Sequence, residues 1–201
     1  MNAAYHHGAL RDALVDAAVE VVATSGIEAV SLRELARRVG VSSGAPYRHF
    51  ADKDAVLAAV ARRGFERFDR ALARVSKQYA PAPALEAVQR LGVAYVRFAA
   101  KHPNLFRLIF GPAAPRVGVD AALDEARRRA GAHLPRALGR LQAEGVATHT
   151  STRELTELAW ALVHGVAMLH LDGLVGGGGV ASAERLAERV TGQLGALLRV
   201  S

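Results

Sequence analysis

The residues whose chemistry stands out lie between Ser31 and Arg63, where cations and hydroxyl groups gather. This segment carries seven Lys and Arg side chains against three acids, a local net charge of +4. Several of its side chains are able to bind phosphates or base edges, namely Ser42, Ser43, Tyr47, Arg48 and His49. Because phosphate neutralisation supplies most of the affinity of proteins for DNA, this segment has the composition of a DNA-binding surface.

Two short helices joined by a tight turn are expected to position these groups. Ser31 can cap the first helix, and Glu34, three residues later, completes the pattern of a capping box. Gly40 permits the left-handed backbone that ends this helix. A second helix is expected over residues 44–49, capped by one of the two serines that precede it. The pattern is typical of a helix-turn-helix, and the alternative is an ordinary helical hairpin.

The run SLRELARRVGVSSGAPYRHFADKDAVLAAV, residues 31–60, resembles the DNA-binding segment of tetracycline-repressor-type (TetR family) transcriptional regulators. The shared features are a hydroxyl residue that opens the first helix, the pattern A-x-x-x-G-V-S, and the ordered pattern Y-x-H-F-x-x-K-x-x-x-L that begins at Tyr47. Ala45 and Pro46 replace the usual Thr-Leu of the family. Because Pro46 falls in the first turn of its helix, the replacement bears on base specificity more than on the fold.

We expect the polar residues of this segment to have two roles on DNA. Lys53 lies where, in the family, a side chain meets the phosphate backbone, and the dipole at the start of its helix favours the same anion. The residues expected to hold phosphates and set the register are Ser31, Tyr47, His49 and Lys53. Those placed nearer to base edges are Ser42, Ser43, Ala45 and Arg48, and Arg33 completes the candidate DNA-binding set.

Composition restricts the other classes of protein. With 201 residues, 51% of them hydrophobic, the chain can bury one large core or two small ones. No stretch reaches the ~20 apolar residues that span a membrane. A signal-peptide pattern and cysteine are both absent from the sequence, so a cytoplasmic protein is expected. Most of the net charge of +7 lies in residues 65–201 and is therefore weak support for DNA binding.

A search for catalytic patterns gives a negative result. The sequence contains no Gly-rich phosphate loop, no G-x-S-x-G, no H-E-x-x-H and no C-x-x-C. His164 and His170 are six residues apart, a rotation of roughly 600° on a helix, so their side chains diverge. We therefore expect no catalysis, no metal site and no cofactor.

The whole chain is predicted to be all-α, with about nine helices. A helix from about Ala9 to Ser25 completes a three-helix head, after a short polar arm whose role is left open and which contains Tyr5, His6 and His7. Pro135 is expected to bend one long helix. Further helices are expected over about 52–78, 84–102, 104–110, 119–144, 151–172 and 181–199.

Two domains follow from this reading of the elements. Residues 1–55 form the predicted helix-turn-helix DNA-binding domain, and residues 56–201 form the predicted effector-binding and dimerisation domain. The segment with Pro81 and Pro83 interrupts the helical pattern and is expected to act as a hinge between head and body.

Two motifs in the second half resemble the ligand-binding domain of one large TetR subgroup, which is marked by a Trp-x-x-x-His-Gly run. The motif WALVHG places Trp160 and His164 on one helical face, and HPNLFRLIFG adds aromatic residues able to line a cavity. The alternative is that the aromatic residues fill an ordinary core and His164 is a satisfied buried histidine. The resemblance implies an effector site, with the candidate residues Phe98, His102, Phe106, Phe110, Trp160 and His164.

Each of the last two predicted helices has an apolar face, and this face can be interpreted in two ways. The two helices can belong to the core of the chain, or they can form a four-helix interface with a second copy. The family resemblance implies the second arrangement. The candidate interface residues are Leu155, Leu158, Leu162, Gly165, Val166, Leu169, Leu186, Val190, Leu194 and Leu197.

These features together predict a homodimeric, sequence-specific transcriptional regulator, most often a repressor, that binds an inverted-repeat operator in double-stranded DNA. A small, largely apolar effector is expected to favour a head spacing that no longer fits the operator. The runner-up is an architectural, non-specific DNA-binding dimer without an effector. An all-α enzyme is the third alternative.

Overall fold

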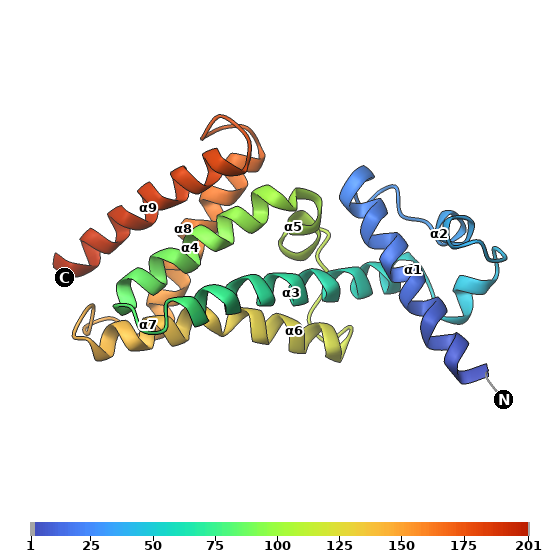
Figure 1. Cartoon of the computed structure of the whole chain (residues 1–201), viewed down its shortest axis with the longest axis horizontal. Helices are drawn as coiled ribbons and strands as arrows, with labels where there is room; N and C mark the ends of the chain where they lie inside the picture. Colours follow the sequence, from blue (N-terminus) through green and yellow to red (C-terminus); the bar gives the residue numbers. More distant parts are fainter. Residues whose placement is uncertain (1–2, 201) are drawn as a thin grey trace. The chain divides into compact units, whose positions relative to one another are not determined.

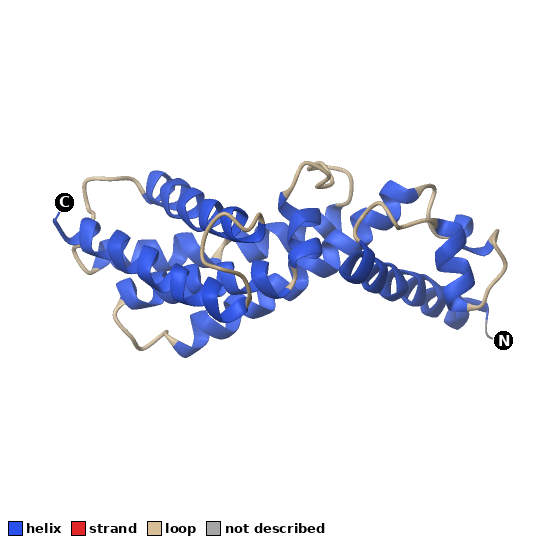
Figure 2. Cartoon of the chain, turned by 90° about the horizontal axis from the view of Figure 1, so that it is seen from above, coloured by secondary structure: helices blue, strands red, loops and turns tan. Residues whose placement is uncertain are grey.

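The computed structural model describes the backbone of residues 3–200 and the side chains of residues 9–195. Throughout this part of the chain every regular element is helical, which confirms the predicted all-α class (Figures 1 and 2). The elements in chain order are α1 (Ala3–Ser25), α2 (Leu32–Val39), the 3-10 helix η1 (Ala45–Arg48), α3 (Lys53–Gln78), α4 (Ala84–Lys101), α5 (Pro103–Phe110), α6 (Ala121–Gly131), α7 (His133–Ala143), α8 (Thr152–Leu171) and α9 (Val180–Val200).

Residue contacts divide the chain into two compact units. The first unit comprises Met1–Phe65 and Asn104–Ala126, and the second comprises Glu66–Pro103 and Arg127–Ser201. The predicted domain boundary after residue 55 therefore falls inside the first unit. In addition, α5 and the loop after it group with the helix-turn-helix rather than with the helices around α4.

The first helix of the chain is longer than predicted. Helix α1 begins at Ala3, so the backbone of the expected polar arm is already helical, while the side chains of Tyr5, His6 and His7 lie outside the described residues. It ends at Ser25 as predicted, because Gly26 follows with φ 84°, a left-handed conformation that glycine adopts without steric cost.

Helix α2 begins and ends as its sequence predicts. The Ser31 hydroxyl accepts a hydrogen bond from the backbone N–H of Glu34 at 3.2 Å, and Gly40 ends the helix with φ 77°. The second half of the predicted capping box is not formed. The Glu34 carboxylate instead accepts from Arg37 and Arg38, each at 2.8 Å, because these guanidinium groups at i+3 and i+4 offer charge-assisted hydrogen bonds.

The second element of the helix-turn-helix differs from the prediction in type and in capping. It is a 3-10 helix of four residues, not an α-helix over 44–49, and its N-cap is Gly44, so neither Ser42 nor Ser43 caps it with a side chain. Pro46 lies in its first turn as expected and removes one donor from an already short element. The backbone N–H of His49 donates to the Pro46 carbonyl at 2.9 Å, the i→i+3 bond typical of a 3-10 turn.

The long helix predicted over 119–144 is two helices. Helix α6 ends at Gly131 and α7 begins at His133, so the prediction of one helix bent at Pro135 was wrong. The proline has no N–H for the carbonyl of residue 131, and its ring clashes with that carbonyl in a continuous helix. The chain therefore ends one helix and places Pro135 in the first turn of the next, where the missing donor costs nothing.

Helix α4 is the central element of the second unit, in contact with α7, α8 and α9 (Figure 1). Its Gly92 faces the other helices so closely that a Cβ added there would lie 2.7 Å from Thr191 Cγ2 and 3.1 Å from Val163 Cγ1. Thr191 is buried, and its hydroxyl donates to the Ala187 carbonyl at 2.8 Å. The three helices thus meet at a position that leaves no room for a side chain.

We expect Gly92→Ala to lower the free energy of unfolding by about 1 kcal/mol. Overpacking a filled core costs roughly 1–3 kcal/mol, whereas alanine gains only about 1 kcal/mol of helix propensity over glycine. Urea unfolding of the variant, followed by circular dichroism, measures the difference.

Gly139 provides the matched control because it lies inside α7 with nothing within 4 Å of an added Cβ. Gly139→Ala should raise the free energy of unfolding by about 0.5–1 kcal/mol. Adding Thr191→Ser to Gly92→Ala removes the nearest methyl group and should recover part of the loss. A Gly92→Ala variant that is stabilised as much as Gly139→Ala would contradict the tight packing of α4.

Candidate nucleic-acid interface and effector region

The predicted DNA-binding residues lie together in the first unit, on α2, η1 and the start of α3. Six of them are exposed: Ser31, Arg33, Ser42, Ser43, Tyr47 and Arg48. The other three, Ala45, His49 and Lys53, are half-buried. Within the described part of the chain, neither Arg33 nor Arg48 has an ion-pair partner, so both guanidinium groups are available to phosphates or bases.

Two buried side chains hold η1 against the first unit. Pro46 and Phe50 are both buried, whereas Tyr47 between them is 54% exposed. The guanidinium of Arg11 on α1 lies over the Phe50 ring, 5.0 Å from its centroid, a cation–π contact that adds to the packing. The alternation of buried and exposed residues directs Tyr47 and Arg48 outward.

The start of α3 is already capped by its own chain. As predicted, Asp52 caps the helix, since its carboxylate accepts from the Ala55 N–H at 2.8 Å. Lys53 Nζ donates to the Glu28 carbonyl at 3.3 Å and lies 3.8 Å from the Glu28 carboxylate. A phosphate at this position therefore meets Lys53 beside an occupied helix N-terminus, and must compete with Glu28 for the ammonium group.

An ion network on α2 was missed by the sequence reasoning. The hydrogen bonds from Arg37, and then those from Arg38, lower the pKa of the Glu34 carboxyl to about 2. The Glu34 carboxylate thus remains ionised over the whole physiological range and holds both guanidinium groups on α2. The i, i+3 and i, i+4 spacing of an acid before two arginines was the available signal.

In the second unit, Tyr95 joins two of the predicted effector residues. Trp160 Nε1 donates to the Tyr95 hydroxyl at 3.2 Å, and this hydroxyl lies 2.9 Å from His164 Nδ1. Burial raises the pKa of Tyr95 and lowers the pKa of His164, so both groups are neutral at pH 7. A hydrogen bond therefore joins the Tyr95 hydroxyl to His164 Nδ1, and the tautomer of the histidine sets which of the two atoms donates.

A second aromatic contact in this unit involves the end of α4. The Phe98 ring lies 5.0 Å from the Phe68 ring and 5.1 Å from the His102 ring, centroid to centroid. Burial, followed by the nearby charges of Lys101 and Arg67, lowers the pKa of His102. This histidine is therefore neutral, and its ring extends the aromatic layer.

The remaining two predicted effector residues belong to the first unit. Phe106 is fully buried, and its ring lies 4.9 Å from Phe110, which in turn lies 5.5 Å from Phe65. A Cβ at Gly64 would lie 2.8 Å from Ile109 Cγ2, so α5 packs tightly on α3 in this unit.

The structure thus arranges the six candidates in small clusters within each unit and adds Tyr95 and Phe68 to them. Tyr95 lies three residues before Phe98 on α4, a spacing that was visible in the sequence. No local pattern indicated Phe68, because its partners lie on another helix.

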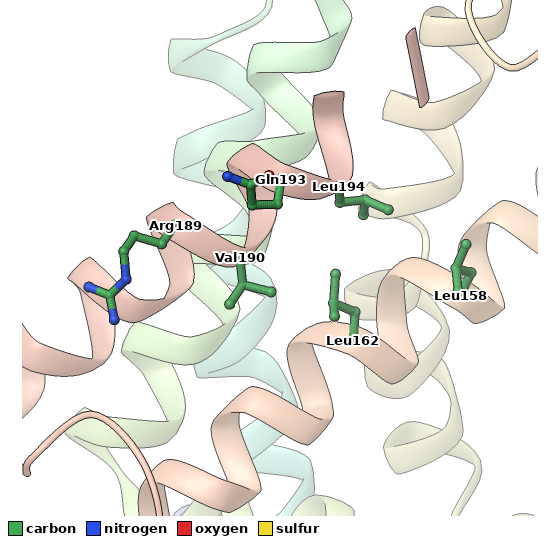
Figure 3. A pocket seen from close by; sticks show the side chains of 6 residues that line it. All are labelled: Leu158, Leu162, Arg189, Val190, Gln193 and Leu194. Atoms are coloured by element: carbon green, nitrogen blue, oxygen red, sulfur yellow. The ribbon is translucent and has the colours of Figure 1, made fainter. Parts of the chain in front are cut away.

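An apolar groove runs between α8 and α9 (Figure 3). Its volume is about 630 Å³, and the residues that line it are Leu158, Leu162, Arg189, Val190, Gln193 and Leu194. Leu162 and Val190 lie in the space between the two helices in Figure 3. Leu158, which lines the groove, is 55% exposed, and Leu169, which does not line it, is 44% exposed.

The other predicted interface residues have different environments. Leu155 is only 3% exposed and lies in the core of its own chain. Val166, Gly165 and Leu186 are half-buried. The side chain of Leu197 lies outside the described residues.

Membrane-spanning helices and clusters of metal ligands are both absent from the described residues. No helix among them is long and apolar enough to cross a membrane. Likewise, no group of three or more His, Cys, Asp or Glu side chains in this part of the chain is arranged to hold a metal ion.

The chain matches two family descriptions. Residues 14–60 match "Bacterial regulatory proteins, tetR family", and residues 88–194 match "Tetracyclin repressor-like, C-terminal domain". Neither description names the Trp-x-x-x-His-Gly subgroup, so that assignment stays a prediction.

Similar proteins include both solved structures and a curated repressor. A protein with unknown function from Rhodococcus sp. RHA1 is 31% identical, with a TM-score of 0.82 over 98% of this chain and 100% of that one. The HTH-type transcriptional repressor Rv1474c of Mycobacterium tuberculosis (strain ATCC 25618 / H37Rv) is 39% identical over 62 residues, 31% of this chain and about a third (33%) of that relative.

A second similar solved structure has a bound ligand. The transcriptional regulator FadR from Bacillus subtilis, solved in complex with stearoyl-CoA, is 18% identical, with a TM-score of 0.65 over 89% of this chain and 96% of that one. Likeness at this identity shows the shared fold. The two family matches, of which the C-terminal one alone covers more than half of the chain, establish that the chain belongs to the tetR family of bacterial regulatory proteins.

Proposed function

We propose that this chain is a cytoplasmic, homodimeric transcriptional repressor that binds an inverted-repeat operator and releases it when a small effector binds. The observation that carries the proposal is the pair of exposed, unpaired arginines, Arg33 and Arg48, on consecutive elements of a helix-turn-helix. Tyr47 is exposed beside Arg48. Cations and an aromatic hydroxyl on this motif match the contacts by which such motifs hold phosphates and read bases.

The shortness of η1 limits how many side chains can read bases. A 3-10 helix of four residues presents few positions, and Arg48 is the residue among them with the reach and the two-donor fork that suit a guanine edge. Lys53, which carries a single ammonium group and is held by Glu28, is suited to a phosphate. Arg48 is thus assigned to sequence preference and Lys53 to affinity.

The groove between α8 and α9 supports a homodimer. Two copies related by a twofold axis would pack these helices into a four-helix interface and cover Leu158, Leu162, Val190 and Leu194. A dimer also places two heads on successive major grooves of an inverted repeat, about 34 Å apart.

The effector is proposed to bind the second unit among its aromatic residues. Phe68, Phe98 and Tyr95 form an apolar layer, and the Tyr95–His164 pair offers a polar contact within it. A largely apolar effector suits this lining, and the FadR relative with stearoyl-CoA is an example of a similar fold that binds an acyl compound.

A dimer without an effector is the second candidate. The ring contacts of 5.0 and 5.1 Å around Phe98 favour it, because they show aromatic residues packed against one another.

Arg48→Ala and Lys53→Ala should affect DNA binding in different ways. Loss of the guanidinium should cost about 1–3 kcal/mol at one base position of each half-site and relax the preference there. Loss of the ammonium should weaken binding to all sequences alike. Selection from randomised duplexes, followed by titration of the selected and scrambled duplexes, separates the two effects.

Ser25→Ala serves as a control for an exposed substitution in the first unit, because Ser25 ends α1, lies outside the candidate DNA-binding set and carries no charge. If Arg48→Ala and Lys53→Ala both lower affinity uniformly, the assignment of base reading to Arg48 is wrong.

Leu162→Asp should dissociate the dimer at micromolar concentration, because it places a charge in the proposed apolar interface. Leu174→Asp is the matched control, since Leu174 is 70% exposed in the loop after α8 and does not line the groove. Sedimentation equilibrium measures both. Unchanged association of the Leu162→Asp variant would exclude the groove as the interface.

A further inference from the structure

One face of α3 in the second unit carries a row of four cations. Arg67, Arg70, Arg74 and Lys77 follow one another at intervals of three, four and three residues, which places them on one side of the helix. All four are exposed. We refer to these four residues as the cation row.

The acids of the described chain do not form ion pairs with the cation row. The single acid among residues 67–78, Asp69, is directed to α7 instead. Its carboxylate lies 2.8 Å from His133 Nε2 and 3.9 Å from Arg129 Nε, while Ser76, two turns later, lies 3.0 Å from His133 Nδ1. The face of α3 that meets α7 is therefore distinct from the cation row.

Three other cations of this unit differ from the cation row because each is paired with an acid. Arg90 lies 3.5 Å from Glu188, Arg97 lies 3.0 Å from Glu184, and Arg153 lies 2.9 Å from Glu157. These pairs leave little net field at their own positions.

His102 lies near one end of the cation row, and the positive charges there affect its pKa. After burial, the charges of Lys101 and Arg67 are the causes that lower the pKa of His102. Lys101 ends α4, so the positive region extends beyond α3 onto a second helix.

Net charge is distributed unequally between the two units. The second unit holds 16 Lys and Arg against 9 Asp and Glu, whereas the first unit, with the helix-turn-helix, holds 10 against 10. The whole net charge of +7 therefore lies in the unit that the helix-turn-helix does not explain. A net charge placed in this way raises the local concentration of polyanions at that unit.

We propose that the cation row binds the phosphate backbone of duplex DNA, without regard to sequence, as a second DNA-binding surface separate from the helix-turn-helix. The ten-residue span of the row is about 15 Å long at 1.5 Å per residue. A duplex presents one phosphate charge per ~1.7 Å, hence roughly nine over this length. Three of the four residues are arginines, whose planar fork binds phosphate in a bidentate manner.

The proposed function makes DNA the polyanion that the protein meets, but the second surface does not depend on operator recognition. One surface selects the sequence, while the other holds flanking or neighbouring duplex. The consequence is sequence-independent capture of DNA by the second unit, and with it the ability to bridge two duplex segments.

The test compares two triple variants of the full-length chain that change net charge equally. Arg70→Gln/Arg74→Gln/Lys77→Gln removes most of the cation row, and Arg90→Gln/Arg97→Gln/Arg153→Gln removes three paired cations of the same unit. Fluorescence anisotropy of a labelled 20-base-pair random duplex, titrated over a range of NaCl concentrations, gives the slope of log K against log [NaCl]. Equal melting temperatures confirm that both variants fold.

We expect the magnitude of the slope to fall by about 2–3 for the variant of the cation row, at about 0.9 for each lost phosphate contact, and by less than about 0.5 for the control. The sequences selected from a randomised pool should be the same for both variants. If the slope changes equally in the two variants, net charge alone explains the effect, and the proposal is overturned. An unchanged slope in both would also overturn it.

A second probe distinguishes DNA from an acidic protein partner. Labelled poly-glutamate should bind more weakly than the random duplex at the same salt concentration. Tighter binding of poly-glutamate, lost in the variant of the cation row, would assign the surface to an acidic protein and overturn the proposal. Failure of operator recognition is seen separately, as a wild-type protein that selects no sequence.

Discussion

The proposed reading of DNA depends on the burial of Pro46 and Phe50 on either side of two exposed residues. A 3-10 helix of four residues has too few hydrogen bonds to hold its own position. Its placement therefore comes from apolar contacts with the first unit, supported by Arg11 over the Phe50 ring. If these anchors are lost, Tyr47 and Arg48 lose their fixed orientation, and a base contact that requires a two-donor geometry becomes a loose phosphate contact.

The second unit is built by a comparable constraint, the close approach of helices at Gly92. Polar caps fix the helices that converge there. Both carboxylate oxygens of Glu144 accept from the Ala84 N–H at 3.0 Å and close the start of α4, while Ser151 and Glu154 form a capping box at the start of α8. With α4 buried at the centre, α8 and α9 turn their remaining apolar side chains outward. An exposed apolar groove of this kind contributes nothing to one copy of the chain and is useful when a second copy covers it.

Much of the fold could be predicted because its rules are local. Four residues act within one turn of the helix that they begin or end, and the structure confirms all of them: Ser31, Gly26, Gly40 and Asp52. Errors arose where two local rules compete. Glu34 has the position that a capping box requires in the sequence. Its carboxylate nevertheless accepts hydrogen bonds from the guanidinium groups of Arg37 and Arg38 instead of capping the helix. Pro135 fits both a bend and a helix start, and the competition is settled by the break at residue 132.

The candidate sites also differ in how far the sequence could predict them. The DNA-binding residues are contiguous in sequence, so one motif gathers them on one surface. The proposed effector residues come from several helices, and Tyr95 and Phe68 were missed because their contacts depend on tertiary packing. For the same reason, the charge difference between the two units could not be read before the contacts had shown which residues belong to each unit.

The most direct test of the central claim is the selection of sequences by the wild-type protein from a randomised duplex pool at near-physiological salt. The account predicts enrichment of an inverted repeat whose half-sites are about 10 base pairs apart, centre to centre. Binding without enrichment, lost steeply as salt rises, would contradict it and leave phosphate attraction as the only mode of DNA binding.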